Sequence, residues 1–221
     1  MPPRIKTFYL WDLAGTLFSE KWNIEKSGVA NFHAYVESLG YDLKTVDPET
    51  YEGCYKIPYS EGLFDLSVAE GFQEVLEWTK NNGFFTTGTP AQIDWRAVQL
   101  KKRYNLDPRP FLPERFSTFD YGNTNVKTPE MLMDILEKKH AENYAAVVYT
   151  DDKSANCEFF LQSYLKVKNQ VAPLKARAYY FTDNEQDIVQ LADNYWQAGT
   201  LLQLRENEQR LDKIVYNNED H

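Results

Sequence analysis

The sequence predicts an α/β protein with a parallel, doubly wound sheet and one helical insertion after the first strand. Short apolar segments alternate with amphipathic helical segments along most of the chain, which is the pattern of a parallel sheet covered by helices. Residues 18–68 interrupt the alternation, because they show helical spacing and no clear core strand. Hydrophobic residues make up 43% of the 221 residues and charged residues 26%, as in ordinary globular domains.

The strands are expected where β-branched and aromatic residues form short runs. The first run, residues 5–11, reads Ile-Lys-Thr-Phe-Tyr-Leu-Trp. The run Ala-Ala-Val-Val-Tyr at residues 145–149 is apolar and is expected to form another strand. The other expected strands are residues 84–87, 116–119, 176–181 and, as a last edge strand, 201–204.

Helices are expected where apolar residues recur three and four positions apart. Phe72, Val75 and Leu76 fall at such steps, and Gly83 would serve as the C-cap of their helix. The expected helices are residues 24–39, 69–82, 92–104, 129–140, 157–166, 185–196 and a final charged helix.

Composition limits the classes of partner. The formal net charge of −9 repels a phosphate backbone, so we expect no nucleic-acid partner, whereas a small phosphorylated molecule stays compatible with a local cation. Cys54, Cys157 and three histidines form neither a disulfide framework nor a Cys/His zinc cluster. No apolar run approaches the roughly 18 residues of a membrane span, and residues 1–6 lack a secretory signal. We expect a cytoplasmic monomer or homodimer that does not contact membranes.

Polar residues follow several of the expected strands, where ligands bind in open α/β sheets. Asp12 follows the first strand, Thr87 and Gly88 follow the second, and the pair Asp151 and Asp152 follows residues 145–149. Lys127 precedes the helix that begins at Pro129. Phosphoryl transfer to a carboxylate needs these groups: one carboxylate attacks phosphorus, a hydroxyl and an ammonium hold the oxygens, and further carboxylates hold Mg²⁺.

The order of these residues resembles the four motifs of the haloacid dehalogenase (HAD) superfamily. Residues 8–18 are similar to its first motif, an apolar strand followed by Asp-x-Asp-Gly-Thr. Thr87-Gly88-Thr89-Pro90 resembles the second motif, and Lys127-Thr128-Pro129-Glu130 resembles the third. Residues 151–156 resemble the fourth, Gly-Asp-x-x-x-Asp, with Asp151 at the Gly position and Asn156 at the final Asp.

The resemblance implies a Rossmann-like core of residues 1–17 and 69–221, with residues 18–68 as a small helical cap domain that selects substrate. It also implies the roles of site residues in an Mg²⁺-dependent hydrolase. Asp12 would be the nucleophile and a metal ligand, and the backbone carbonyl of Ala14 a second ligand. Asp152, together with Asp151, would complete the Mg²⁺ site. The catalytic residues Thr87 and Lys127 would hold the phosphoryl group, and Gly88 would contact substrate.

Ala14 departs from the family pattern, because it replaces the second Asp of the first motif. That Asp is the general acid/base of the family's phosphatases, and its loss costs about 10²–10⁴-fold with a poor leaving group. A first interpretation is therefore a hydrolase of phosphates with good leaving groups, such as acyl or aryl phosphates.

Two alternatives stay open at the level of sequence. Asp-x-Ala-Gly-Thr resembles the first motif of phosphonoacetaldehyde hydrolase, which implies C–P bond cleavage with a Schiff-base lysine from the cap. Lys56 is the most suggestive cap lysine, because its apolar neighbours would lower its pKa. The other cap lysines are Lys21, Lys26 and Lys44. The second alternative is a protein that keeps the fold as a binding or interaction partner without catalysis.

Overall fold

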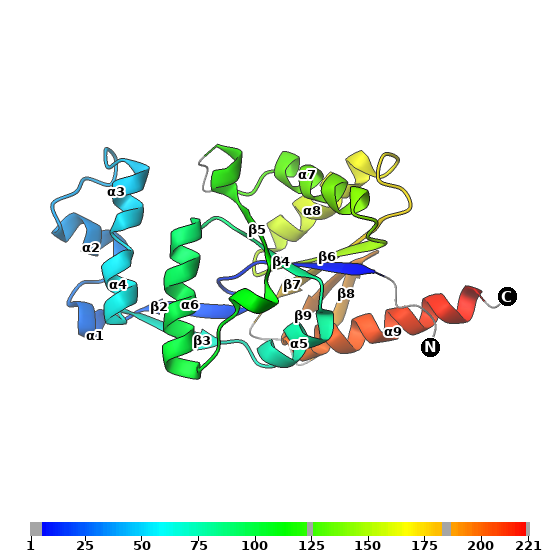
Figure 1. Ribbon diagram of the computed structural model, residues 1–221, viewed down its shortest axis with the longest axis horizontal. Coiled ribbons are helices and arrows are strands. Elements are labelled where there is room, and N and C mark those ends of the chain that lie inside the picture. The colour runs from blue at the N-terminus through cyan, green and yellow to red at the C-terminus, as the bar shows by residue number, and fades with distance from the viewer. Residues whose placement is uncertain (1–5, 123–125, 183–186, 220–221) are drawn as a thin grey trace.

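The computed structural model describes residues 6–122, 126–182 and 187–219. Within these residues seven strands form one sheet in the order β5-β4-β1-β6-β7-β9-β8 (Figure 1). Each neighbouring pair is parallel except β8 and β9, which are antiparallel. The strands are β1 Thr7–Trp11, β4 Asn82–Thr86, β5 Glu114–Ser117, β6 Ala146–Asp151, β7 Lys175–Phe181, β8 Val189–Ala192 and β9 Tyr195–Ala198.

Helices cover both faces of this sheet, which confirms the predicted doubly wound α/β class (Figure 1). Two separate apolar clusters lie between the sheet and these helices. Phe8 and Leu10 of β1 belong to one cluster, whereas Tyr9 and Trp11 belong to the other. Residues 8–11 of the strand are therefore all apolar or aromatic, because both faces of the strand are buried. One face carries α7 Pro129–Ala141 and α8 Ser154–Val167, and the other α5 Phe72–Thr79, α6 Pro90–Tyr104 and α9 Leu201–Glu219.

The strand order places the first strand at a point where the chain reverses its direction across the sheet. β1 pairs with β4 on one side and with β6 on the other. Trp11 at the end of β1 is level with Phe84 of β4 and with Thr150 of β6. The carboxyl ends of these three strands therefore meet, which is where open α/β sheets bind ligands.

Residues 18–68 carry a two-stranded ribbon that was not predicted. β2 Phe18–Trp22 pairs in antiparallel fashion with β3 Phe64–Val68. The division into core and cap domains stays a prediction, but the helices between these strands lie to one side of the large sheet (Figure 1). These helices are α1 Ile24–Ser27, α2 Phe32–Ser38, α3 Pro48–Gly53 and α4 Lys56–Glu61.

The expected helix over residues 24–39 is broken into two. Gly28 ends α1 with a φ of 71°, a conformation that glycine adopts without strain. Asn31 then caps α2, since its side chain accepts a hydrogen bond from the backbone N–H of Ala34 at 2.9 Å. The prediction from apolar periodicity therefore treated as one helix two helices that Gly28 and Asn31 separate.

Two expectations near the C-terminal end were wrong. A helix was predicted over residues 185–196, of which the structure describes residues 187–196. These residues contain β8 and the start of β9, which form a hairpin, and no helix. Asn194 supplies the left-handed turn residue of this hairpin, with a φ of 61°. The predicted edge strand at residues 201–204 is the first turn of α9, where the Thr200 hydroxyl accepts a hydrogen bond from the backbone N–H of Gln203.

Gly83 is not a helix C-cap. It lies inside β4, paired with Leu10 and Glu114. A Cβ at this position would come within 2.7 Å of the Phe8 ring, so close packing between strand and ring requires glycine. The helix before it ends at Lys80, which has a φ of 61°.

Two short 3₁₀ helices complete the described elements, η1 Arg109–Phe111 and η2 Thr118–Tyr121. Among the described helices, we find none whose length and apolar character would allow it to cross a membrane.

Candidate active site

Asp12 directly follows β1. Its backbone N–H donates a hydrogen bond to the carbonyl of Thr150 in β6 at 2.8 Å, which continues the pairing of the two strands. The loop that follows passes close to Asp152. Gly15 has a φ of 89°, and a Cβ built on it would lie 2.5 Å from Cγ of Asp152. Glycine is therefore required here both for the backbone conformation and for the approach of the Asp152 carboxylate.

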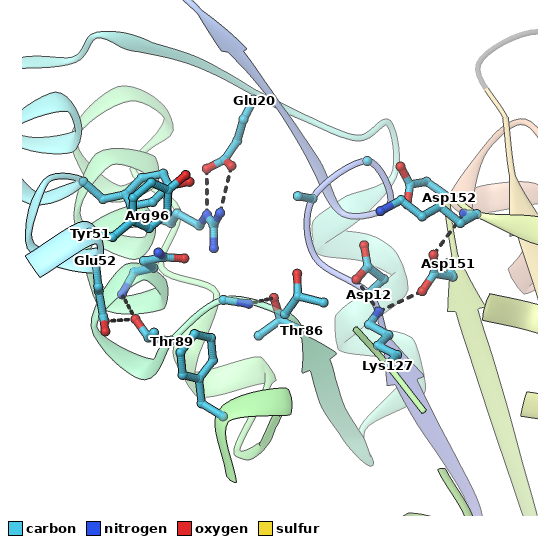
Figure 2. Close-up of a pocket in the computed structure, with 18 of the residues that line it drawn as sticks. Asp12, Glu20, Tyr51, Glu52, Thr86, Thr89, Arg96, Lys127, Asp151 and Asp152 are labelled. Atoms are coloured by element: carbon cyan, nitrogen blue, oxygen red, sulfur yellow. Dashed lines mark hydrogen bonds and ion pairs between the residues drawn. The ribbon is translucent and has the colours of Figure 1, made fainter. Parts of the chain in front are cut away.

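Lys127 joins two of the carboxylates. Its ammonium lies 2.6 Å from Oδ1 of Asp12 and 2.8 Å from Oδ2 of Asp151. It also donates to the hydroxyl of Tyr149 at 3.1 Å. The Lys127 side chain is 4% exposed, and that of Asp151 is fully buried. The structure thus brings together residues that lie more than a hundred positions apart in the chain (Figure 2).

Asp151 is the centre of a hydrogen-bond network. Asn156 donates through Nδ2 to both carboxylate oxygens at 3.0 Å, and the backbone N–H of Lys153 donates to Oδ1 at 2.9 Å. The Tyr149 hydroxyl donates to Oδ2, as does Lys127. Four donor groups therefore make five hydrogen bonds to the two oxygens of Asp151. This leaves Asp12 and Asp152 as the carboxylates of the cluster that are better placed to bind a ligand.

Asp12, Asp151 and Asp152 form the one candidate metal cluster found among the described residues. Each offers an oxygen, and these atoms all lie within 4.8 Å of one another. Hard oxygen donors of this kind suit Mg²⁺. Ala14 lines the same cavity, so its backbone is close to the cluster.

The electrostatics of the cluster favour the binding of a cation. Burial, reinforced by the charges of Asp151 and Asp152, raises the pKa of Asp12 to about 7 although Lys127 opposes this shift. Burial and the neighbouring Asp151 likewise raise the pKa of Asp152. Burial also disfavours the ionised form of Asp151, but Lys127 and the hydrogen bonds outweigh it and lower the pKa of that carboxyl. The single ammonium of Lys127 therefore does not balance the three carboxylates.

A second threonine, which the sequence motifs did not mark, also contributes a buried hydroxyl to the wall of the cavity. Thr86, rather than Thr87, is the last residue of β4, and Figure 2 shows it between Asp12 and the cap side of the cavity. Its Oγ1 accepts a hydrogen bond from the backbone N–H of Gly88 at 3.0 Å. Thr86 is 6% exposed, whereas Thr87 is exposed, and both line the cavity together with Gly88. The apolar run Phe84–Phe85 ends directly before Thr86, and this was the available signal.

A cavity of about 870 Å³ extends from the carboxylate cluster to the cap. Two pairs of side chains cross between cap segment and core at its far side (Figure 2). Arg96 of α6 binds Glu20 of β2 in a bidentate ion pair, with distances of 2.6 and 2.9 Å, and Thr89 donates a hydrogen bond to Glu52 of α3. Of these four residues, only Thr89 lies in one of the sequence motifs, and nothing in the sequence indicated its partner. The remaining lining residues include Ser19, His33, Leu43, Val46, Tyr51, Tyr55, Gln92, Phe119 and Lys153.

The predicted substrate contact of Lys56 is contradicted. Lys56 is the exposed first residue of α4 and does not line the cavity. The three other cap lysines are exposed as well and are equally absent from its wall. A Schiff-base mechanism therefore has no cap lysine at the cavity, and the C–P hydrolase alternative is dropped. These three are Lys21, Lys26 and Lys44.

Comparison with known proteins gives information on the fold. No family model and no curated protein sequence matches this chain. The crystal structure of UTR4 protein (Unknown transcript 4 protein) from Saccharomyces cerevisiae matches 89% of this chain and 98% of its own, with 14% identity and a TM-score of 0.50. A HAD family enzyme from Bacteroides thetaiotaomicron, solved as a magnesium complex, matches 83% of this chain and 96% of its own, with 11% identity and a TM-score of 0.52. The chain therefore has the HAD fold that the sequence motifs predicted.

Proposed function

We propose that this protein is an Mg²⁺-dependent phosphohydrolase that forms a covalent aspartyl-phosphate on Asp12. The observation that carries the proposal is the joint placement of Asp12, Lys127 and two further carboxylates under a large cavity at the carboxyl ends of β1, β4 and β6. The magnesium complex of the Bacteroides enzyme with the same fold supports the choice of metal.

The donor set fits a magnesium ion held by Asp12, Asp152 and the backbone carbonyl of Ala14. Asp151 would position Lys127 rather than bind the metal, because its oxygens already accept five hydrogen bonds. When bound, Mg²⁺ supplies charge neutralisation for the transferring phosphoryl group and for the attacking carboxylate. A small phosphorylated molecule is the substrate class that this site would take.

The residues of the chain would then divide the two chemical steps among them. Thr86 and Lys127 hold the phosphoryl oxygens, and the Gly88 N–H keeps the Thr86 hydroxyl in place. A carboxylate oxygen of Asp12 forms a bond to phosphorus, and the bond from phosphorus to the leaving-group oxygen breaks with its electron pair going to that oxygen. Water then attacks the same phosphorus, releases inorganic phosphate and regenerates the Asp12 carboxylate.

Ala14 restricts the leaving group. It offers no acid to protonate a departing alkoxide, and Asp151 is held as an ionised hydrogen-bond acceptor. General acid/base assistance increases a rate by about 10²–10⁴-fold. Substrates whose leaving group departs without a proton should therefore be hydrolysed faster than alkyl esters by a factor of that order. Acyl and aryl phosphates have such leaving groups.

The test is phosphate release from acetyl phosphate and 4-nitrophenyl phosphate with and without Mg²⁺. We expect turnover in the wild type that disappears with Asp12→Asn and with chelation of the metal. Asp94→Asn is the matched control, because Asp94 is a half-exposed carboxylate of α6 that does not line the cavity. Absence of turnover in the wild type with both substrates would contradict the proposal, as would full activity in Asp12→Asn.

Ala14 also favours a second candidate function, in which the fold binds a phosphorylated ligand without turning it over. The lost acid is the observation behind it. Calorimetric binding of Mg²⁺ and inorganic phosphate by a protein that hydrolyses neither test substrate would favour this alternative.

A further inference from the structure

The cavity is much larger than a phosphoryl group. It holds about 870 Å³ and extends from the carboxylate cluster to the cap. Figure 2 shows Asp12, Lys127 and Asp152 at one end, Tyr51 and Glu52 at the other, and Thr86 between them. A phosphoryl group on Asp12 would occupy only the first end. The second end is therefore where the rest of the substrate would lie.

The wall at the cap end is aromatic and held in place by further rings. Tyr51 of α3 and Tyr55, which stands directly before α4, both line the cavity. The Tyr55 ring is stacked on Phe32 with a centroid distance of 3.7 Å and on Phe64 at 6.1 Å. Tyr51 meets Tyr55 edge to face at 5.8 Å. These contacts fix the rings before any ligand arrives, which reduces the ordering cost of binding.

Three charged side chains at this end already have partners within the protein, either an ion pair or a hydrogen bond. Arg96 is 8% exposed and forms its bidentate ion pair with Glu20, which also accepts a hydrogen bond from the Tyr59 hydroxyl at 2.6 Å. Glu52 accepts the hydrogen bond from Thr89. A flat, uncharged group suits such a wall better than a second anionic or cationic group does.

We propose that the substrates are aryl phosphates, in which the leaving group is a flat aromatic ring seated against Tyr51 and Tyr55. This inference rests on the proposed phosphoryl transfer and names its substrate class. When the phosphorus–oxygen bond breaks, the electron pair stays on the phenolate oxygen, which takes its proton from water after it leaves. An aromatic leaving group therefore satisfies two conditions: it packs against the tyrosines of the cavity wall, and it departs without the acid that Ala14 lacks.

The test compares two ligands that differ only in the ring. Benzylphosphonate and cyclohexylmethylphosphonate have the same charge and the same chain length, and phosphoryl transfer does not cleave their carbon–phosphorus bond. Titration calorimetry with the Mg²⁺-loaded wild type should show about 2- to 10-fold tighter binding of the aromatic ligand, as one offset ring pair provides. Tyr51→Leu and Tyr55→Leu should bring this ratio close to one.

Two control variants separate the ring from other effects. Tyr55→Phe keeps the ring and should keep the preference. Tyr41→Leu should keep it too, because Tyr41 belongs to the cap segment but is 42% exposed and does not line the cavity. Circular dichroism establishes that each variant is folded. If Tyr55→Leu disturbs the packing of the neighbouring rings, the result with Tyr51→Leu decides the test.

The outcomes distinguish this inference from the proposed function. Equal affinity for the two phosphonates, no binding of either, or a preference that survives in Tyr51→Leu would each overturn the inference. Turnover of 4-nitrophenyl phosphate without a ring preference overturns only the aryl specificity. A ring preference in a protein that turns over neither 4-nitrophenyl phosphate nor acetyl phosphate supports the aromatic site and overturns the hydrolase.

Discussion

Replacing Lys127 by Met tests whether the buried ammonium holds the cluster together. The substitution keeps the length of the side chain and removes the positive charge that lies 2.6 Å from Asp12 and 2.8 Å from Asp151. Asp12 is 9% exposed and Asp151 fully buried, so solvent compensates only a small part of the lost interaction. Breaking a buried ion pair in this way costs about 3–5 kcal/mol. In a chain of this length that corresponds to a fall in Tm of about 6–20 °C.

The loss of stability caused by Lys127→Met should depend on pH. The direction of this dependence follows from the burial of the two carboxyls. Burial is the largest influence on both carboxyls and raises their pKa values, whereas Lys127 lowers them. Without Lys127 the folded state therefore favours the protonated forms, with pKa values above those of the unfolded chain. Stability is then retained at low pH and lost as the pH rises through the folded pKa values. We expect a large loss near pH 8 and a clearly smaller one near pH 5.

The assay is thermal and urea unfolding of metal-free protein in a chelating buffer at both pH values. Lys138→Met is the matched control. Lys138 lies in α7, the helix that follows Lys127, but its side chain is half-exposed and its ammonium lies 3.8 Å from Glu114. Exposed pairs of that kind contribute about 0–1 kcal/mol. A Lys127→Met protein that unfolds within about 1 kcal/mol of the wild type at pH 8 would refute the assignment of Lys127 as the counter-charge of the cluster.

Three further predictions concern the same loop and cluster. Gly15→Ala should displace Asp152 and destabilise the protein by about 1–3 kcal/mol, seen as a lower Tm together with weaker Mg²⁺ binding by calorimetry. Ala14→Asp should raise the rate with alkyl phosphates by about 10²–10⁴-fold and change aryl phosphate turnover far less; equal effects on both would argue against a leaving-group role. The pKa of Asp12, raised to about 7 chiefly by burial, implies that protons compete with the metal. The apparent Mg²⁺ affinity should then fall about tenfold per pH unit below about pH 7, and a constant affinity from pH 6 to 8 would contradict this.

The fold was largely predictable because its signals are local. The continuous apolar run of β1 follows from burial on both faces, and the helices on the sheet follow from their apolar spacing. The hairpin of β8 and β9 was mistaken for a helix, because Val189 and Leu191 of β8 are exposed on an edge strand and carry no alternating pattern. The turn at Asn194 was the local sign of two strands.

The candidate site was predictable in its residue types and less so in its geometry. The order of the motifs pointed to Asp12, Lys127 and the acidic pair, which the structure brings together. Thr86 was missed by one position, since a strand end is hard to place to a single residue. Glu20 and Arg96 are 76 positions apart in the chain, and no local pattern encodes a contact at that separation.

Asp151 and Ala14 have opposite effects on the charge of the site. Relative to the family pattern, Ala14 removes a carboxylate and Asp151 adds one at the Gly position of the fourth motif. Three ionised carboxylates and the ammonium of Lys127 leave a formal charge of −2, which a divalent cation balances. The hydrogen-bonded Asp151 cannot replace the acid that Ala14 lacks, because Lys127 and the other donors lower its pKa and keep it ionised. If the proposed function holds, the two exchanges together keep the charge that an Mg²⁺ ion needs and change the leaving groups that the site can serve. The site should then differ from one with Asp at position 14 in its substrate rather than in its metal.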